Sequence, residues 1–383
     1  MGLILKLVIG IVLGTLVGLF APEVLTRLLL TFKALFGEFL FFIIPLLILF
    51  FITSGIAGLP KNSGRLLGRT LGIAYVSTII AGIGAFFVAS LVVPMLASES
   101  RELTQAAASA LTPLITIDVD PLFSVMTALV LAFILGLGIN ATNASSLHGL
   151  SDEGRNIIER ILVKIIIPLL PVYIAGVFAE MASAGTVFET LKTFGIILVL
   201  AVALHWVYLT VMFIAAGAKS GQSPIFLIKN MLPAYFTALG TMSSAATIPV
   251  TLQAVKNNKV DDDIANFTVP LCATTHLAGS TITIVSCTVA VMVLHSSLAI
   301  PSFFTVLPFI LMLGLVMLAA PGVPGGAVMS AVGLLGSMLG FGESAIALMI
   351  ALYMAQDSFG TACNVTGDGA IALFVDNAAK NTA

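Results

Sequence analysis

Long apolar segments separated by short polar ones follow one another along the whole chain. Six of these segments are long enough to span a bilayer as helices, and they lie at 3–21, 29–58, 67–96, 119–140, 157–183 and 193–217. Four further apolar blocks, which carry Ser, Thr, Pro and Gly near their centres, lie at 223–255, 264–295, 301–341 and 344–375. The pattern predicts an all-α membrane protein whose second half is built differently from its first half.

Two of the later blocks have interrupted middles, TALGTMSSAATIPV at 237–250 and LAAPGVPGGAVMS at 318–330. Non-helical backbone at membrane depth is tolerated only where it is buried in protein or lines a wet cavity. We therefore interpret both blocks as re-entrant helical hairpins whose tips meet near the midplane, which brings helix N-termini and free carbonyl groups to one point. The alternative is a Gly/Ser-rich packing face or a proline kink, which a single break would favour more than two breaks do.

The last block contains acidic side chains at membrane depth. Four polar residues in the segment 353–374 recur at the spacing of one helix face: Asp357, Thr361, Asn364 and Asp368. A carboxylate at the bilayer centre costs roughly 2.5–3.5 kcal/mol on insertion scales, and the sequence has no lysine or arginine between positions 260 and 379 to pair with it. Two such carboxylates on one face predict a site for a cation and a polar solute.

Composition supports a membrane location. The 383-residue chain is 59% hydrophobic and only 9% charged, and its mean hydropathy is +1.15. So few charges cannot cover the surface of a soluble domain, and a net charge of −2 gives no indication of a nucleic-acid partner. The N-terminal segment lacks a small-x-small cleavage site after its apolar run, so we interpret it as the first membrane helix rather than a signal peptide.

The sequence does not have the common motifs of energy-coupled or hydrolytic enzymes. It contains no P-loop, HExxH or GxSxG pattern, so neither an ATP-driven pump nor a common hydrolase is indicated, and we do not expect an enzyme. The cysteines Cys272, Cys287 and Cys363 lie in apolar segments without metal-ligand spacing and are interpreted as small core residues.

The basic residues indicate an orientation for eight spans and two hairpins. With the N-terminus inside, twelve of the sixteen basic residues are cytoplasmic: Lys6, Lys61, Arg65, Arg69, Arg155, Arg160, Lys164, Lys219, Lys229, Lys256, Lys259 and Lys380. The four outer ones are Arg27, Lys33, Arg101 and Lys192. This three-to-one bias agrees with the positive-inside rule.

Three motifs resemble those of the dicarboxylate/amino acid:cation symporters, relatives of the glutamate transporters. They are SSAATIPVT at 243–251, PGVPGG at 321–326 and NVTGD at 364–368, and the likeness continues in the same order through the whole chain. Within the family, HLAGSTITI at 276–284 and the pattern QDS…TA.N…D at 356–368 are similar to the bacterial sodium/serine–threonine branch.

The resemblance implies an elevator-type transporter with eight transmembrane helices and two re-entrant hairpins. It also implies a homotrimer in the bacterial inner (plasma) membrane, surrounded by lipid, in which a transport domain slides against a fixed scaffold. The implied division is scaffold helices 1 and 2 at 1–66, transport-domain helix 3 at 67–96, scaffold helices 4 and 5 at 97–185, and the rest of the transport domain at 186–383.

The resemblance also implies a set of substrate-binding residues. Asp357 matches the aspartate that holds the amino group of the solute, and a buried carboxylate neutralised only by an arriving ammonium agrees with that role. Hydroxyls and backbone N–H groups at the first hairpin tip suit an α-carboxylate, and glycines at the second tip suit a gate. The full set is Ser243, Ser244, Ser280, Gly322, Val323, Asp357, Gly360, Thr361 and Asn364.

Two positions depart from the relatives that carry acidic substrates. Gly360 stands where those relatives have an arginine that grips the side-chain carboxylate, and Met242 stands where many of them have another arginine. Without either guanidinium, a second negative charge on the solute would lie desolvated and unpaired. We therefore expect a small neutral amino acid similar to serine, threonine or alanine, with an acidic amino acid or dicarboxylate as the alternative.

A sodium site is implied by a second group of residues. Sodium is a hard cation that takes oxygen ligands, including carbonyls of unwound backbone, and the unwinding is expected near 274–279. The implied ligands are Tyr75, Thr78, Cys272, Thr274, His276, Asn364 and Asp368. Ala278 and His276 replace an aspartate and an asparagine that are usual in this turn, and loss of that carboxylate would remove one sodium site.

His276 has three interpretations. Its carbonyl coordinates sodium while the imidazole points away, or the imidazole titrates and couples transport to protons, or it is a neutral buried histidine satisfied by a hydroxyl. His205, Trp206, His148 and His295 are interpreted as structural. The expected function is a secondary symporter of a small amino acid and a monovalent cation, and the rival is a channel-like or receptor protein with the same pocket.

Overall fold

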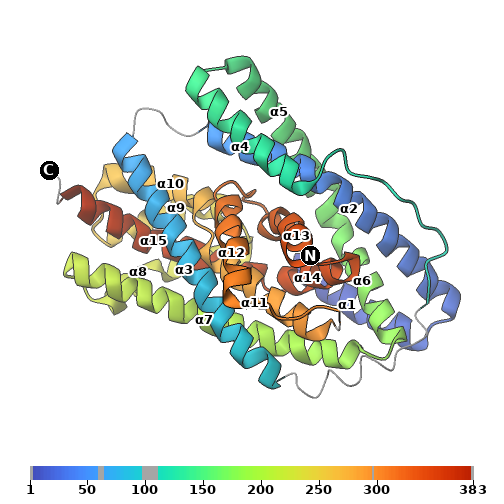
Figure 1. Ribbon diagram of the computed structural model, residues 1–383. Coiled ribbons are helices and arrows are strands. Elements are labelled where there is room, and N and C mark those ends of the chain that lie inside the picture. Colours follow the sequence, from blue (N-terminus) through green and yellow to red (C-terminus); the bar gives the residue numbers. More distant parts are fainter. Residues whose placement is uncertain (1–2, 59–63, 97–110, 296, 381–383) are drawn as a thin grey trace.

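The computed structural model describes residues 3–58, 64–96, 111–295 and 297–380, and these residues form helices and the segments that connect them, with no strand among them (Figure 1). This agrees with the predicted all-α fold. Lys61 and Arg101, two of the basic residues counted for the orientation, fall in the segments 59–63 and 97–110, which lie outside the described residues.

Helices from the first half of the chain pack against one another. They are α1 (Leu3–Phe20), α2 (Glu23–Ala57), α4 (Val125–Thr142), α5 (Ser145–Ile161) and α6 (Ile167–Ser183), with a π-helical turn at Leu162–Ile166 between the last two. α1 packs along α6, and α2 contacts α4, α5 and α6. Small residues allow the α1–α6 contact, because a Cβ at Gly10 or Gly14 would overlap the backbone at Pro171 or Ala175.

A second group of helices surrounds the C-terminal segment. It contains α3 (Gly64–Leu96), α7 (Val187–Ser220), α8 (Pro224–Thr241), α9 (Ser244–Asn257), α10 (Asp262–Thr275), α11 (Ala278–Leu294), α12 (Phe303–Met317), α13 (Gly326–Leu339), α14 (Glu343–Met354) and α15 (Asp357–Lys380). α15 contacts α3, α7, α8, α9, α10 and α11. In Figure 1 these elements form one side of the molecule and α2, α4 and α5 form the other.

The chain interrupts its helices at both predicted breaks, although the first break is shorter than its sequence suggested. α8 and α9 are separated only by Met242, which has a φ of 54°, and Ser243, whose extended backbone caps α9. α12 and α13 are separated by the longer turn 318–325, which ends at Gly325 with a φ of 76°. Each pair of helices packs against itself, as helical hairpins do.

Two further interruptions lie in the remaining blocks. α10 ends at Thr275 and α11 begins at Ala278, so His276 and Leu277 form the unwound turn expected near 274–279. The block 344–375, which counts as a single span among the eight expected, is broken between α14 and α15, with a bend of 60°. Gln356 and Asp357 lie at this break without a Gly or Pro beside them, so the apolar pattern did not reveal it.

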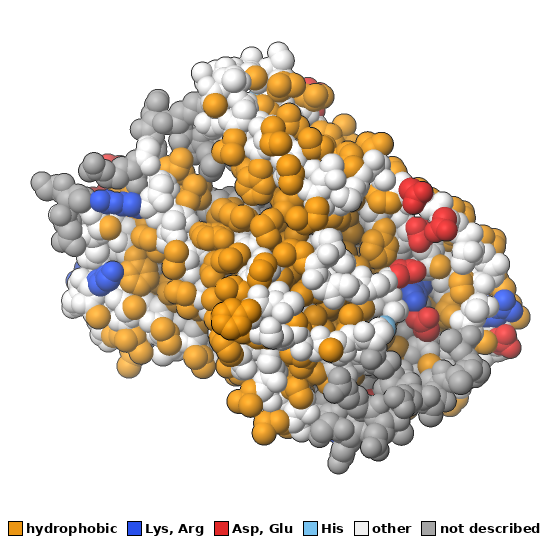
Figure 2. Space-filling model, in the orientation of Figure 1, with side chains coloured by type: hydrophobic (Ala, Val, Ile, Leu, Met, Phe, Trp, Pro, Cys, Tyr) orange, Lys and Arg blue, Asp and Glu red, His pale blue; other side chains and the backbone are white. Residues whose placement is uncertain are grey.

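Six helical segments of the described chain are long and apolar enough to cross a membrane, or seven when the bent pair α14–α15 is counted as one span. α1 is a shorter apolar helix, so the predicted count of eight spans is not established. The face of the molecule drawn in Figure 2 has charged side chains at two opposite ends and a largely apolar band between them. Such a band is what a protein that crosses a bilayer several times presents to lipid.

Candidate functional site

The tips of the two hairpins touch each other. The hydroxyl of Ser243, between α8 and α9, donates a hydrogen bond of 3.1 Å to the carbonyl of Gly322 in the turn 318–325. The same hydroxyl accepts the N–H of Ala246 at 3.3 Å and so caps α9. The expected meeting of the two tips is therefore seen in the structure, and the N-terminus of α9 lies at that meeting point.

The second hairpin is also tied to the acidic helix. Asp357, the first residue of α15, is buried, and its Oδ2 accepts the backbone N–H of Gly325 at 2.7 Å. Gly325 directly precedes α13, so this carboxylate lies at a helix N-terminus, where the backbone dipole favours negative charge. No lysine or arginine pairs with Asp357 in the described part of the chain. Its charge is thus stabilised by a backbone N–H group and not by a basic side chain.

The polar stripe predicted along α15 faces the protein interior. Asn364 Oδ1 accepts the N–H groups of Gly279 and Ser280 at 2.8 and 3.1 Å, and its Nδ2 donates to Ser280 Oγ at 2.9 Å. Asn364 therefore caps the N-terminus of α11 from a neighbouring helix, which satisfies two N–H groups that helix ends leave free. This brings Asn364 and Ser280 together, as the substrate set requires, but it occupies the amide oxygen that a cation would need.

Two glycines allow α11 and α15 to lie this close. A Cβ at Gly279 would overlap the carbonyl oxygen of Gly360 and lie 2.5 Å from Cβ of Cys363. A Cβ at Gly360 would meet Ser280 and Thr283 at 3.4 Å or more, which is ordinary contact. Gly360 thus has a packing environment on α11 in addition to its proposed part in selectivity.

The other predicted substrate residues lie around the same turns. Thr361 Oγ1 donates to the carbonyl of Asp357 at 2.9 Å, so its hydroxyl hydrogen is used within its own helix. Ser244 is the first residue of α9 and is buried. Val323 lies in the turn 318–325, where its carbonyl accepts the N–H of Gly326 at 2.9 Å.

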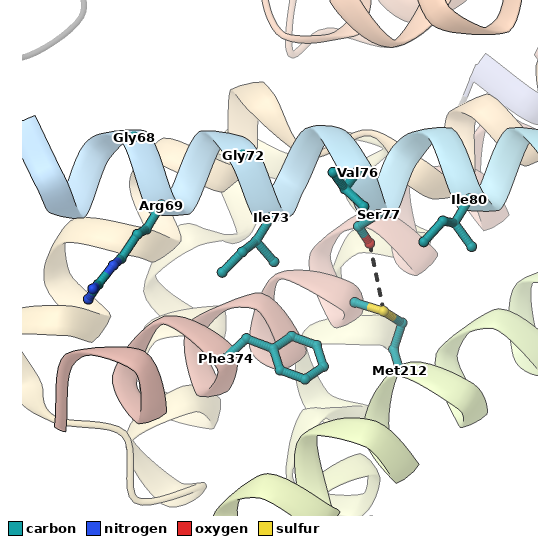
Figure 3. Close-up of a pocket in the computed structure, with 9 residues that line it drawn as sticks. All are labelled: Gly68, Arg69, Gly72, Ile73, Val76, Ser77, Ile80, Met212 and Phe374. Carbon is teal, nitrogen blue, oxygen red and sulfur yellow. Dashed lines mark hydrogen bonds between the residues drawn. The ribbon is translucent and has the colours of Figure 1, made fainter. Parts of the chain in front are cut away.

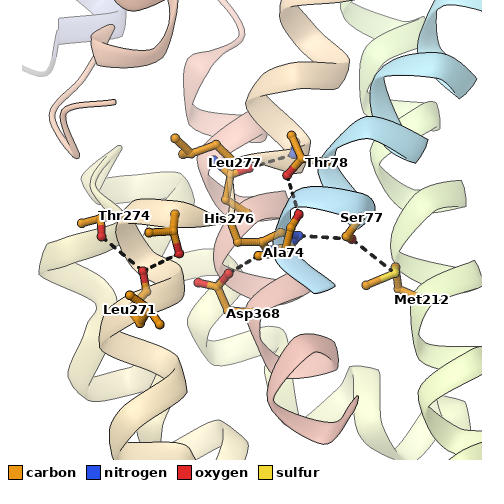
Figure 4. A network of polar contacts seen from close by, with 12 residues as sticks. Ala74, Ser77, Thr78, Met212, Leu271, Thr274, His276, Leu277 and Asp368 are labelled. Atoms are coloured by element: carbon orange, nitrogen blue, oxygen red, sulfur yellow. Dashed lines mark hydrogen bonds and ion pairs between the residues drawn. The ribbon is translucent and has the colours of Figure 1, made fainter. Parts of the chain in front are cut away.

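A separate network surrounds the second carboxylate (Figure 4). His276 Nδ1 donates to Asp368 Oδ1 at 2.9 Å, and both side chains are almost completely buried. On the other side of the ring, Nε2 lies 3.3 Å from Ser77 Oγ and 3.2 Å from the hydroxyl of Tyr208. Gly367 makes room for the ring, because a Cβ there would lie 2.9 Å from Cε1 of His276.

This geometry bears on the interpretations of His276. The interpretation as a neutral histidine satisfied by a hydroxyl agrees with the contacts of Nε2 to Ser77 and Tyr208. It does not account for Nδ1, which contacts the carboxylate of Asp368. Asp368 uses Oδ1 on the imidazole, and no hydrogen bond reaches Oδ2 from the described residues. That second oxygen is the atom of this network best suited to a hard cation.

The remaining predicted cation ligands do not all gather here. Thr78 is buried on α3 and donates to Ala74, whereas Thr274 donates to Leu271 on α10, on the other side of the turn (Figure 4). Tyr75 points to the second hairpin and donates to the carbonyl of Leu311 at 3.2 Å. The carbonyl of Cys272 accepts the N–H of His276 at 2.9 Å. The ligand set therefore stays a prediction.

Sequence reasoning missed Ser77 and Tyr208 and treated His205 as structural. The hydroxyl oxygens of Ser77 and Tyr208 are 2.5 Å apart, and both contact Nε2 of His276. His205 Nε2 donates to the carbonyl of Gly279 at 3.0 Å, behind the turn that Asn364 caps. The only signal available was an isolated polar residue inside an otherwise apolar helix.

An open groove approaches this network from α3 (Figure 3). Its volume is about 530 Å³, and it lies between α3, Met212 of α7 and Phe374 of α15. Ser77 lines the groove and donates to the sulfur of Met212 at 3.7 Å. The serine thus has the groove on one side and His276 on the other.

Comparison with known proteins identifies the family of this chain. The model of the sodium:dicarboxylate symporter family matches residues 3–378. A serine/threonine transporter SstT of Streptococcus suis is 30% identical over 304 residues, which are 74% of this chain and 81% of that protein. The SstT proteins of Enterococcus faecalis and Acinetobacter baylyi are 26% and 28% identical and cover 96% and 99% of this chain, with 90% and 98% of their own lengths matched. The resemblance inferred from the sequence motifs is confirmed: this chain belongs to the sodium:dicarboxylate symporter family.

Proposed function

We propose that this protein is a secondary symporter that couples sodium influx to the uptake of a small neutral amino acid such as serine or threonine. The observation that carries the proposal is the buried carboxylate of Asp357, which holds the tip of the second hairpin and forms no ion pair with any described lysine or arginine. The family match supports coupling to sodium, and the names of the SstT relatives support the substrate class.

The solute would bind where the two hairpin tips meet α15. Asp357 supplies the negative charge for an ammonium group, and the start of α9 at Ser243 and Ser244 offers N–H groups to an α-carboxylate. Asn364 lies about two turns further along α15. Its Nδ2 donates to Ser280, which lies at the start of α11. The lack of a guanidinium at positions 242 and 360 favours a neutral side chain over an acidic one.

The cation would bind near Asp368. Asp368 is buried and its Oδ2 receives no hydrogen bond from the described residues, and the helix is interrupted at 276–277, beside the imidazole that Asp368 contacts. A charged carboxylate in an apolar interior is stabilised when a cation arrives. Coupling follows if the second hairpin closes most stably when both the cation and the solute are bound.

The helix packing supports an elevator mechanism with a scaffold and a transport domain. The scaffold would contain α1, α2 and α4–α6, and the transport domain would contain α3 and α7–α15, which surround α15. Counting α1 as a span gives eight spans and two re-entrant hairpins. A homotrimer in the bacterial inner membrane, with lipid around the scaffold, completes the proposal.

Uptake in proteoliposomes tests the function. With an inward sodium gradient, labelled serine should rise above its external concentration, whereas a channel would only equilibrate it. Serine and threonine should compete with the label more strongly than glutamate does. A thermal-shift screen of amino acids and dicarboxylates, with and without sodium, would identify the solute independently of transport, and preferential stabilisation by glutamate or a dicarboxylate would contradict the proposed selectivity.

A further inference from the structure

A polar cavity of about 200 Å³ lies apart from the carboxylates described above. It is bounded on one side by α2 and α5 and on the other by the end of α10 and the start of the turn 318–325. Its polar lining comes from Arg155, Ser54, Thr274 and Thr275. At the ~30 Å³ that each molecule occupies in liquid water, the cavity would hold about half a dozen waters, which is space enough for a small polar solute.

Arg155 is an incompletely satisfied cation on this cavity. The guanidinium carbon lies 5.4 Å from the ring centroid of Phe51, so one face of the group is covered by an aromatic ring. Its Nε is buried without a hydrogen-bond partner, and no carboxylate forms an ion pair with Arg155 among the residues that the structure describes. A buried donor without an acceptor is costly, and an anionic ligand would satisfy it.

The rest of the lining suits the positive end of a zwitterion. The hydroxyls of Thr274 and Thr275 both donate to the carbonyl of Leu271, so their oxygens remain able to accept hydrogen bonds. Ser54 donates to Asp152 at 2.7 Å, so its oxygen also remains able to accept a hydrogen bond. A guanidinium and several acceptor oxygens around one small space match the carboxylate and the ammonium of an amino acid.

The turn 318–325 connects this cavity to the proposed substrate site. Its last residue, Gly325, is bound to Asp357, while Leu318, Ala319 and Ala320 at its other end line the cavity of Arg155. Ala319 also lies against Gly55 of α2, where an added Cβ would be 3.1 Å away. A movement of this turn away from Asp357 would therefore also change the wall of the Arg155 cavity, on the side that faces the proposed substrate site.

We propose that Arg155 forms a second, weaker amino-acid site. Its guanidinium would hold the carboxylate of the solute beside the second hairpin while the solute passes between Asp357 and bulk water. This inference rests on the proposed function, because it takes the transported amino acid as the ligand. Arg155 contacts the solute only after the solute has left Asp357, or before it reaches it.

Equilibrium binding of labelled serine to the purified full-length protein tests the proposal. Wild-type protein should show two classes of site per chain, and Arg155→Gln should weaken the low-affinity class about tenfold or more while preserving the high-affinity class. Asp357→Asn should do the reverse. Arg160→Gln, which changes an exposed arginine on the same helix, is the matched control and should preserve both classes.

The ligand chemistry is tested by competition for the low-affinity class. Acetate should displace serine from it and ethanolamine should do so poorly, because the guanidinium recognises a carboxylate; the opposite order would overturn the assignment. A single class in wild-type protein, or a second class unchanged in Arg155→Gln, would also overturn it, as would an Arg155-dependent response of thermal stability to chloride without a second serine class. Absence of all serine binding would instead contradict the proposed function.

Discussion

Gly325 donates its backbone N–H to Asp357 Oδ2 at 2.7 Å and so joins the tip of the second hairpin to the first residue of α15. The bond is buried, and it connects residues 32 positions apart. Because the carboxylate that we propose for the solute's ammonium also holds the tip of the hairpin, closure of the hairpin and binding of the solute act on one group. Loss of the charge should therefore affect binding more than folding.

Asp357→Asn tests this expectation. The amide oxygen of Asn can still accept the N–H of Gly325, so the variant should fold, but it offers no charge to an ammonium group. A hydrogen bond to a charged group contributes about 1.5–3 kcal/mol, so the affinity for serine should fall roughly tenfold to a hundredfold. Labelled-serine binding and a melting curve without ligand measure the two effects separately. Wild-type affinity in this variant would show that Asp357 does not bind the ammonium.

Asp368→Asn should remove sodium dependence. The variant retains an acceptor for His276 Nδ1 but loses the negative charge that a cation requires. Sodium should then no longer raise the melting temperature, an effect worth about 2.7 kcal/mol in the wild type at a hundredfold excess over Kd. Asp376→Asn is the matched control, since Asp376 is also a buried carboxylate on α15 but is paired with Lys380 at 2.6 Å. An undiminished sodium response in Asp368→Asn would contradict the proposed cation site.

The sequence predicted the helical class and the interruptions that carry Gly, Pro or clustered Ser and Thr. Those residues act locally, because they change backbone freedom or cap a helix within a few positions. The break before Asp357 was missed, since Met354, Ala355 and Gln356 are compatible with a continuing helix. Both α14 and α15 contact α11, but α14 also packs on α6 and α13, whereas α15 packs on α3 and α7–α10, and the chain bends by 60° between them.

The sequence predicted which residues belong to the candidate site, but not which side chains they contact. Asp357 and Asp368 were identifiable because carboxylates in an apolar segment are costly and need a reason. That His276 would lie between Asp368 and Ser77 depends on contacts across 92 and 199 positions of sequence. No local pattern encodes such distances, so the capping role of Asn364 and the contribution of Tyr208 became visible only in the folded chain.

Ser243→Ala should weaken both the fold and the substrate site. The change removes a helix cap of about 1 kcal/mol together with the hydrogen bond to Gly322 that joins the two hairpin tips. Ser302→Ala is the matched control, because Ser302 caps α12 through the N–H of Thr305. Both variants should melt earlier, but only Ser243→Ala should bind serine more weakly. Equal serine affinity in the two variants would show that contact between the tips does not shape the site.

The facing glycines of α11 and α15 give a pair of variants that differ by one methyl group each. Gly279→Ala would push a Cβ into the carbonyl of Gly360 and against Cys363, whereas Gly360→Ala meets only ordinary contacts. Overpacking of this kind costs about 1–3 kcal/mol, so Gly279→Ala should lower the melting temperature clearly and Gly360→Ala much less.

Serine binding in the same two variants separates packing from selectivity. Shifting α11 away from α15 would also disturb the hydrogen bonds from Gly279 and Ser280 to Asn364, so Gly279→Ala should lose affinity for serine. Gly360→Ala should keep a preference for serine over glutamate, because a methyl group supplies no positive charge for a second carboxylate. If the two alanine variants melted alike, the close contact of these helices would not depend on Gly279.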